Sequence, residues 1–389
     1  MNIVIVGGGI VGLSAAWALR RQGHAVTLLE RSGLPNPLGS SVDQHRLIRY
    51  AYGGQLGYMR MVGEAYRAWQ ALWDDLGATL YVATGTLALG GKPDGAKAGA
   101  QADWCAQTVA ALQQDGHSFE ELSVADAVRR FPLLDLAGAG RIVHLPSGGV
   151  LLAERIVHAL ARLVGEQGVR LRRYSEVSAI DADRAAVRLR SGERVEGDLL
   201  IVAAGPWITQ LLPQLGARVT PSRQVVAYLQ PPQETRADWA RHPMVLDIGE
   251  GFYLVPPVRA PDLPGMQGGM TGLKIGDHSF SRDGQPDRDR LADAAEMTPI
   301  LEQCRHRLAH FDRYSLTQVR SCFYTVEDQE RFVAQKIGAA CWALSCCSGH
   351  GFKFGPVIGQ AVAALAAGRV GEGDFARWLG GDATLSAPR

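Results

Sequence analysis

The chain of 389 residues has no excess of charge of either sign, because 40 lysines and arginines are balanced by 39 aspartates and glutamates. Proteins that bind nucleic acid backbones or anionic membranes carry basic surfaces, so neither partner is expected. The chain also lacks an apolar run long enough to cross a bilayer. Its apolar N-terminus has no basic leader and is interrupted by glycines, unlike a signal peptide. These absences predict a cytoplasmic protein that acts on a small molecule.

Cysteine is scarce and has no recognisable spacing. The six cysteines fit neither a secreted disulfide framework nor the paired C-x-x-C pattern of zinc sites, so no metal site is predicted. Reduced thiols are typical of the cytoplasm. The length predicts two or three domains, or one large fold with an insertion.

Periodicity predicts an alternation of strands and helices. Short apolar runs at 2–6 and 25–29 indicate buried strands, and apolar residues recur with helical spacing from Ile10 to Leu19. Further strands are predicted over 80–89, 194–202, 315–324, 332–337 and 341–346, and further helices over 58–76, 153–167, 287–310 and 356–367. The stretch 34–57 has no clear period, which is typical of a functional loop.

Glycines follow the first strand with the spacing G-x-G-x-x-G. Gly7 would make the tight turn, Gly9 would let a pyrophosphate approach the backbone, and Gly12 would allow close helix packing. Glu30, at the end of the second strand, would accept hydrogen bonds from a ribose. The alternative is a glycine-rich turn with no dinucleotide. The motif itself does not distinguish FAD from NAD.

A second glycine-rich turn, at 348–356, precedes the helix predicted over 356–367. The N-terminus of a helix carries partial positive charge, which suits an isoalloxazine ring that gathers negative charge on reduction. A nicotinamide has no evident use for such a feature, so the turn favours a flavin. The alternative is a capped structural helix with Lys353 in solvent.

Five motifs occur in an order that is seen in one known family. They are GGGIVGLSAAWAL, HRLIRYAYG, GLKIGDH, CFYT and SGHGFKFGPVIG. Over nearly its whole length the chain thus resembles the monomeric sarcosine oxidase and N-methyltryptophan oxidase group of the D-amino acid oxidase-like, FAD-dependent amine oxidoreductases. The resemblance implies that FAD takes a hydride equivalent from an amine, that water hydrolyses the imine, and that O2 reoxidises the flavin to give H2O2.

The resemblance also implies roles for single residues. Cys322 matches a cysteine that forms a thioether to the flavin, where residue type alone suggests an inert buried thiol. Arg49 and Lys353 match a pair that holds the substrate carboxylate, and Lys274 matches a lysine near flavin N5 that favours the anion formed from oxygen. The other implied active-site residues are Arg46, Tyr253, Tyr324 and His278. The other implied cofactor-binding residues are Arg31, Ser40, Ser41, Gly349, Gly351 and Phe352.

Three segments depart from the family pattern. The span VPPVRAPDLPGMQGGMTG, between Tyr253 and Lys274, is longer and richer in proline and glycine, which leaves the substrate open. In the first loop VDQH, at 42–45, replaces a glycine-containing run, and His45 could add a polar group near the ring. Cys346 and Cys347 replace small or apolar residues and could be packing thiols.

The expected fold is α/β, with a Rossmann-like FAD-binding domain interleaved with a substrate-binding domain of mainly antiparallel β-sheet plus helices. The FAD-binding domain would comprise 1–80, 147–215 and 322–389, and the substrate-binding domain 81–146 and 216–321. The expected protein is a monomeric oxidase of a small amine that bears a carboxylate, whether sarcosine-like, N-methyl, cyclic or a D-amino acid. The alternatives are a dehydrogenase that passes electrons to a quinone or carrier, and a non-enzymatic nucleotide-binding protein.

Overall fold

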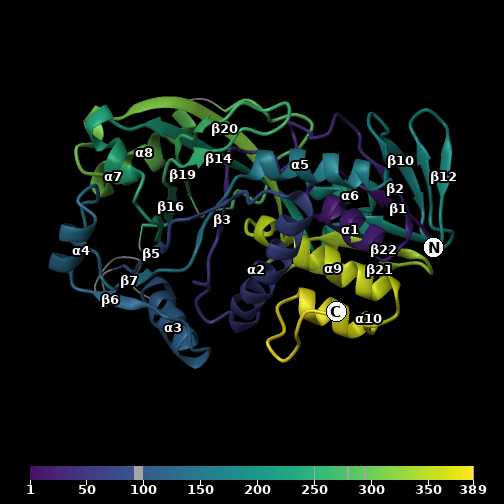
Figure 1. Ribbon diagram of the computed structural model, residues 1–389, viewed down its shortest axis with the longest axis horizontal. Coiled ribbons are helices and arrows are strands. Elements are labelled where there is room, and N and C mark those ends of the chain that lie inside the picture. The colour runs from purple at the N-terminus through teal and green to yellow at the C-terminus, as the bar shows by residue number, and fades with distance from the viewer. Residues whose placement is uncertain (92–99, 249, 278–279, 293–294, 389) are drawn as a thin grey trace.

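Two large sheets lie side by side along the long axis of the molecule (Figure 1). The computed structural model describes residues 1–91, 100–248, 250–277, 280–292 and 295–388. One sheet has six strands and contains the N-terminal strand, and the other has eight. The predicted α/β fold with a parallel and a mainly antiparallel sheet is confirmed.

The six-stranded sheet is buried on both faces. Its order is β21 (Val333–Ile337), β22 (Cys341–Ser345), β13 (Leu199–Val202), β1 (Asn2–Val6), β2 (Ala25–Leu29) and β9 (Arg170–Arg172). The edge strand β21 pairs antiparallel with β22, and the other five strands are parallel to one another. Ile3 and Ile5 pack toward α1 (Ile10–Arg21) and α9 (Gly355–Ala366). Val4 and Val6 pack toward the meander of β10 (Val177–Asp181), β11 (Ala186–Leu189) and β12 (Arg194–Glu196). This burial explains the continuous apolar run of β1.

Helices α1 and α9 are in close contact through small residues. A Cβ atom added at Gly355 would lie 2.4 Å from Ile10 Cγ1, and one added at Gly359 would lie 2.3 Å from the Ser14 carbonyl oxygen. Gly355 and Ile10 are the first residues of their helices. The two glycine-rich turns, about 340 positions apart in the sequence, therefore lie side by side. Helix α5 (Ala153–Glu166) packs against α1, and α2 (Leu56–Leu76) and α10 (Glu372–Leu379) pack against α9.

The eight-stranded sheet carries one wall of the site. Its order is β20 (Ser315–Val326), β14 (Thr220–Gln230), β19 (Leu273–Asp277), β16 (Phe252–Val255), β15 (Met244–Asp247), β5 (Thr86–Leu89), β7 (Ile142–Leu145) and β6 (Glu120–Leu122). All of these pairs are antiparallel except that of β15 with β5. A buried ion pair of 2.6 Å between Arg307 and Asp247 joins α8 (Thr298–Arg307) to β15.

The remaining elements are short or peripheral. Besides short 3-10 helices, they are the three-stranded sheet of β3 (Arg46–Ile48), β8 (Gly149–Leu151) and β4 (Tyr81–Ala83), the pair β17 (Arg259–Ala260) and β18 (Gly269–Met270), and the helices α3 (Ala100–Gln114), α4 (Val124–Arg130), α6 (Ile208–Leu211) and α7 (Arg236–Trp239). In the part of the chain that the structure describes, no helix has both the length and the apolarity that crossing a bilayer requires.

Several predicted elements have different bounds. The strand predicted over 194–202 is divided into β12 and β13, because the Gly197 amide donates to Ala185 and the Asp198 amide donates to Asn2 as the chain changes sheets. The strand predicted over 80–89 breaks at Gly85, which has a φ of 76°. The helix predicted over 287–310 begins at Thr298. Before it, the Asp287 carboxylate accepts hydrogen bonds from the side chains of Trp207 and Gln210, which hold that segment against another part of the fold.

Some short elements lie where the sequence predicts none. Among them, strand β3 lies within the stretch 34–57, which is predicted to be a loop, and α10 follows the helix predicted over 356–367. Both predicted helices over 58–76 and 153–167 are confirmed, since α2 and α5 differ from them by at most two residues at an end.

Candidate active site

A cavity of about 730 Å³ extends from the first glycine-rich turn to the eight-stranded sheet. It collects most of the residues that were predicted for the site, which are Gly7, Gly9, Glu30, Arg31, Ser40, Ser41, Arg46, Arg49, Tyr253, Lys274, Tyr324, Gly349, Gly351, Phe352 and Lys353. Gly12 and Cys322 do not line it. His278 lies outside the described residues.

The first glycine-rich turn has the geometry of a dinucleotide cradle. Gly7 has a φ of 110°, and a Cβ atom there would lie 2.3 Å from the Ala203 carbonyl oxygen. At Gly12 an added Cβ atom would lie 1.9 Å from the Gly7 carbonyl oxygen, so α1 can approach the turn only with glycine there. At Gly9 the nearest atom to an added Cβ is Ser41 Oγ at 3.2 Å, and the backbone of the turn faces the cavity.

Glu30 retains capacity to accept a hydrogen bond from a ribose. Its carboxylate accepts from the amides of Gly8 and Ser32, at 2.9 and 3.0 Å, and from Asn36 Nδ2 at 2.9 Å. A carboxylate has about four acceptor positions, so about one is left for a ligand in the cavity. Ser41 Oγ accepts from the Ile10 amide at 3.0 Å and ties the loop to the start of α1. The cradle and these acceptors fit the adenosine half of FAD.

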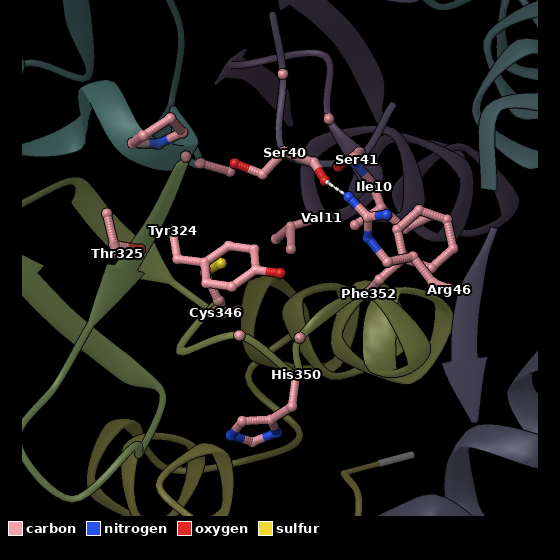
Figure 2. Close-up of a pocket in the computed structure, with 18 of the residues that line it drawn as sticks. Ile10, Val11, Ser40, Ser41, Arg46, Tyr324, Thr325, Cys346, His350 and Phe352 are labelled. Carbon is pink, nitrogen blue, oxygen red and sulfur yellow. Dashed lines mark hydrogen bonds between the residues drawn. The ribbon is translucent and has the colours of Figure 1, made fainter. Parts of the chain in front are cut away.

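Arg31 and Arg46 are held by protein groups at the cavity wall. Arg31 forms an ion pair of 2.9 Å with Asp287 and lies over the Trp207 ring at 4.9 Å. Figure 2 shows the Arg46 guanidinium turned toward Ser40, whose carbonyl oxygen accepts from Arg46 Nη2 at 2.7 Å. Arg46 also lies 3.9 Å from the sulfur of Cys322, the residue implied to bind the flavin covalently.

The second glycine-rich turn places Lys353 inside the protein. Gly351 has no room for a side chain, because a Cβ atom would lie 1.8 Å from the Cys346 carbonyl oxygen. Lys353 is 3% exposed, and its Nζ donates to the Tyr52 hydroxyl at 2.9 Å and to the His350 carbonyl oxygen at 2.7 Å. The alternative of a solvent-exposed Lys353 is therefore wrong.

Arg49 and Lys353 form a pair of cationic side chains around Tyr52, with Lys353 buried and Arg49 partly buried. The Arg49 guanidinium donates to the Ala51 carbonyl oxygen and lies 4.6 Å from the centre of the Tyr52 ring. Burial, followed by the charge of Arg49, lowers the pKa of Lys353 well below its ordinary value. Glu330 also lines the cavity and faces Arg49, and burial raises its pKa. Two neighbouring cations that are costly to bury favour the entry of an anion, and a carboxylate suits both.

Lys274 pairs with an acidic residue that the sequence analysis does not assign to the site. Its ammonium lies on β19, 2% exposed, and donates to Asp43 Oδ2 at 2.6 Å. Arg46 forms an ion pair with the same oxygen. Lys274 also lies 5.9 Å from the centre of the Tyr253 ring. Sequence reasoning recognised that the run at 42–45 departs from the family pattern but did not identify Asp43 as the partner of Lys274.

The other departures from the family pattern also reach the cavity. His45 lines it with a buried ring whose Nε2 hydrogen-bonds the Gly272 carbonyl oxygen at 3.1 Å. Burial, followed by the charge of Lys274, lowers the pKa of His45 to about 4, so the ring is neutral at pH 7. Cys346 and Cys347 line the cavity as free thiols, and burial raises the pKa of each.

A dinucleotide cradle that opens into a cavity with buried cations is the arrangement of a dinucleotide-dependent oxidoreductase. The family model described as "FAD dependent oxidoreductase" matches residues 2–365. The chain therefore belongs to this family, and it is an enzyme that oxidises amines or amino acids with FAD.

Individual relatives agree with this assignment. The monomeric sarcosine oxidase of Bacillus sp. (strain NS-129) is 27% identical over 378 residues, which cover 94% of this chain and 92% of that protein. The N-methyl-L-tryptophan oxidase of Salmonella arizonae is 26% identical over 394 residues, with 94% of each chain covered. The crystal structure of L-proline dehydrogenase from P. horikoshii has the same fold, with a TM-score of 0.79 at 18% identity over 98% of this chain and 96% of that chain.

Proposed function

We propose that the protein is an oxidase of a small primary or secondary amine that bears a carboxylate and that it passes electrons from FAD to O2. The observation that carries the proposal is the pair of a buried Lys353 and a partly buried Arg49 in the cavity that begins at the dinucleotide cradle. Sarcosine-like, N-methyl, cyclic and D-amino acids all present one carboxylate and one amine. When bound, FAD supplies the hydride acceptor and returns the electrons to oxygen as hydrogen peroxide.

The residues of the chain would bind and orient the amino acid. Arg49 offers a planar fork and Lys353 a point charge, so that together they fix both the position and the rotation of a carboxylate. Tyr253 and Tyr324, which line the same cavity, would border the rest of the substrate. Burial raises the pKa of both phenols, so they are neutral hydrogen-bonding groups at pH 7.

The cofactor is proposed to lie with its adenosine half at Gly7–Gly12 and its ring near Arg46, Lys274 and the turn at 348–356. Cys322 is proposed to attach the ring covalently. Acid precipitation of the purified protein followed by mass spectrometry tests this, because a thioether keeps the flavin on the denatured chain. If all the flavin appears in the supernatant, Cys322 is a free buried thiol. We also propose that an FAD-binding domain comprises 1–80, 147–215 and 322–389, and that a substrate-binding domain comprises 81–146 and 216–321.

Gly12→Ala is expected to prevent tight FAD binding or to unfold the protein. The new methyl group would overlap the Gly7 carbonyl oxygen, and overpacking of this kind costs about 1–3 kcal/mol or more. Thermal unfolding and the flavin content of the purified protein measure it. Gly373→Ala in α10 is the matched control, since an added Cβ there meets nothing within 4 Å. Equal flavin content in both variants would show that the turn at Gly7–Gly12 does not bind FAD.

A dehydrogenase is the second candidate. The specific observation in its favour is the ion pair of Lys274 with Asp43, which neutralises part of the charge that would favour oxygen reduction. The two candidates differ in the electron acceptor, so peroxide yield separates them. An oxidase forms about one peroxide for each amine oxidised, whereas a dehydrogenase needs a quinone or dye and forms little peroxide.

A screen for peroxide tests the proposed function. The purified protein would be assayed with sarcosine, glycine, proline, pipecolate and D- and N-methyl amino acids, each beside the corresponding amide. At least one acid should give peroxide, and its amide, which lacks the negative charge, should react far more weakly. Turnover of the amides at the same rate would show that the cation pair does not select the substrate.

A further inference from the structure

The carboxylate of Asp43 accepts hydrogen bonds at all of its acceptor positions, although Asp43 does not line the cavity itself. Its Oδ2 accepts from Lys274 Nζ and from Arg46 Nη1. Its Oδ1 accepts from the Tyr228 hydroxyl and from the Gln44 amide. These four donors fill the acceptor positions of a carboxylate. The side chain is 3% exposed, and the two cations hold its pKa well below the ordinary value, so Asp43 is an anion throughout the working pH range.

Lys274 depends on this anion to remain charged. Its ammonium is buried next to a second cation, Arg46, and both burial and that neighbour disfavour the protonated form. Asp43 opposes them through its charge and its hydrogen bond. The balance places the pKa of Lys274 at about 8, below its ordinary value of 10.5 but high enough to keep the ammonium at pH 7.

We propose that Asp43 is a positioning residue that keeps Lys274 protonated and directed into the cavity, and that it thereby sets the pH range in which the enzyme reacts with oxygen. The inference rests on the proposed function of Lys274 in oxygen reduction. Asp43 has two opposite effects on that step: it retains the positive charge on Lys274, and it neutralises part of its field. Asp43, Lys274 and Arg46 together carry a net charge of about +1.

Other groups around Lys274 have defined charge states. His45, from the same loop as Asp43, is neutral at pH 7. Tyr228 on β14, Tyr253 on β16 and Tyr324 on β20 have raised pKa values and are also neutral. The charged neighbours are Arg46 on β3, Asp277 on the strand of Lys274 itself, and Arg320 on β20, whose guanidinium lies 3.8 Å from Asp43. Cys322, also on β20, would be a thioether with no proton to lose in the FAD-loaded protein. Lys274, with a pKa of about 8, is therefore the group whose titration is followed.

Removal of the Asp43 charge should lower the pKa of Lys274. In the isosteric Asp43→Asn the amide nitrogen would replace an oxygen that accepts from two donors, so Asp43→Gly, which leaves room for water, is a second variant. Tyr228→Phe is the control, because it removes one hydrogen bond from Asp43 and retains the charge. In both charge-removing variants we expect the titration midpoint of Lys274 to fall by about one pH unit or more.

The chain is well suited to a direct measurement, since it contains only five lysines, at 92, 97, 274, 336 and 353. Heteronuclear NMR of the FAD-loaded protein, labelled in lysine alone, would follow each side chain through pH, and Lys274→Met would assign the signal. Lys353, whose ammonium donates to Tyr52 and to the His350 carbonyl oxygen, serves as the internal reference. An unchanged midpoint for Lys274 in both charge-removing variants would overturn the inference.

The reoxidation of the reduced enzyme by oxygen gives the second readout. In wild type the rate constant should fall as pH rises through about 8, as Lys274 loses its proton. In Asp43→Asn this fall should move to lower pH, and at low pH the rate should match or exceed that of wild type, because the protonated lysine is no longer neutralised. The inference is supported if the plots of reoxidation rate against pH for wild type and Asp43→Asn cross. A parallel loss at every pH would show that Asp43 is structural and would overturn it.

The same experiment separates this inference from the proposed function. If Lys274→Met reoxidises as fast as wild type, then Lys274 has no role in oxygen reduction and that part of the proposed function fails. The NMR midpoints of Lys274 still report whether Asp43 keeps the lysine protonated.

Discussion

Lys353→Met is expected to weaken substrate binding about ten- to a hundredfold. The buried ammonium would form a charge-assisted hydrogen bond to the substrate carboxylate, and the loss of such a partner costs about 1.5–3 kcal/mol. The dissociation constant of an unreactive carboxylate, followed by the flavin spectrum of the loaded protein, is the direct measurement. Lys336→Met is a matched control, because Lys336 pairs with Glu372 at the surface.

The same site predicts how binding depends on pH. Burial and Arg49 lower the pKa of Lys353 in the free protein, and a bound carboxylate favours its protonated form. Carboxylate affinity should therefore fall as pH rises through the lowered pKa of Lys353. In Lys353→Met this dependence should be lost. Affinity that is equal in wild type and in Lys353→Met at every pH would show that the carboxylate binds elsewhere.

Lys274→Met is expected to slow reoxidation by oxygen by about two orders of magnitude. A unit charge roughly 5 Å from the developing anion, at an effective dielectric constant near 20, contributes on the order of 3 kcal/mol. Asp43 would retain Arg46, Tyr228 and the Gln44 amide as donors, so the fold should survive the substitution.

The control for Lys274→Met is the other half-reaction of the same variant. Anaerobic reduction by the amine should change far less, since hydride transfer forms no anion at the oxygen site. Rapid mixing of the two half-reactions separates them. Equal losses in both would indicate a structural role for Lys274, and no loss in reoxidation would favour the dehydrogenase.

The features that the sequence predicted are those determined by local spacing. The strand, turn and helix at 2–21 depend on neighbouring residues, and the glycine spacing follows from backbone contacts within the turn. The turn at 348–356 was located in the same way, although its contact with α1 could not be inferred from spacing.

The features that were missed depend on contacts between distant segments. Asp43 and Lys274 are 231 positions apart, and no periodic pattern connects them. The charged sequence near Asp287 is typical of an exposed helix. In the structure, however, hydrogen bonds from Trp207 and Gln210 to Asp287 hold this segment in an irregular conformation. Strand β3 has too few residues to show a period in the sequence, and it is defined by its pairing with β8.

Anaerobic addition of candidate amino acids to the FAD-loaded protein, followed by admission of oxygen, tests the central claim most directly. The account predicts that at least one carboxylate-bearing amine bleaches the flavin, and that oxygen restores the colour with about one peroxide per flavin. A flavin that no such amine reduces would contradict the account. So would a reduced flavin that oxygen leaves bleached while a quinone restores it, because that result would establish a dehydrogenase.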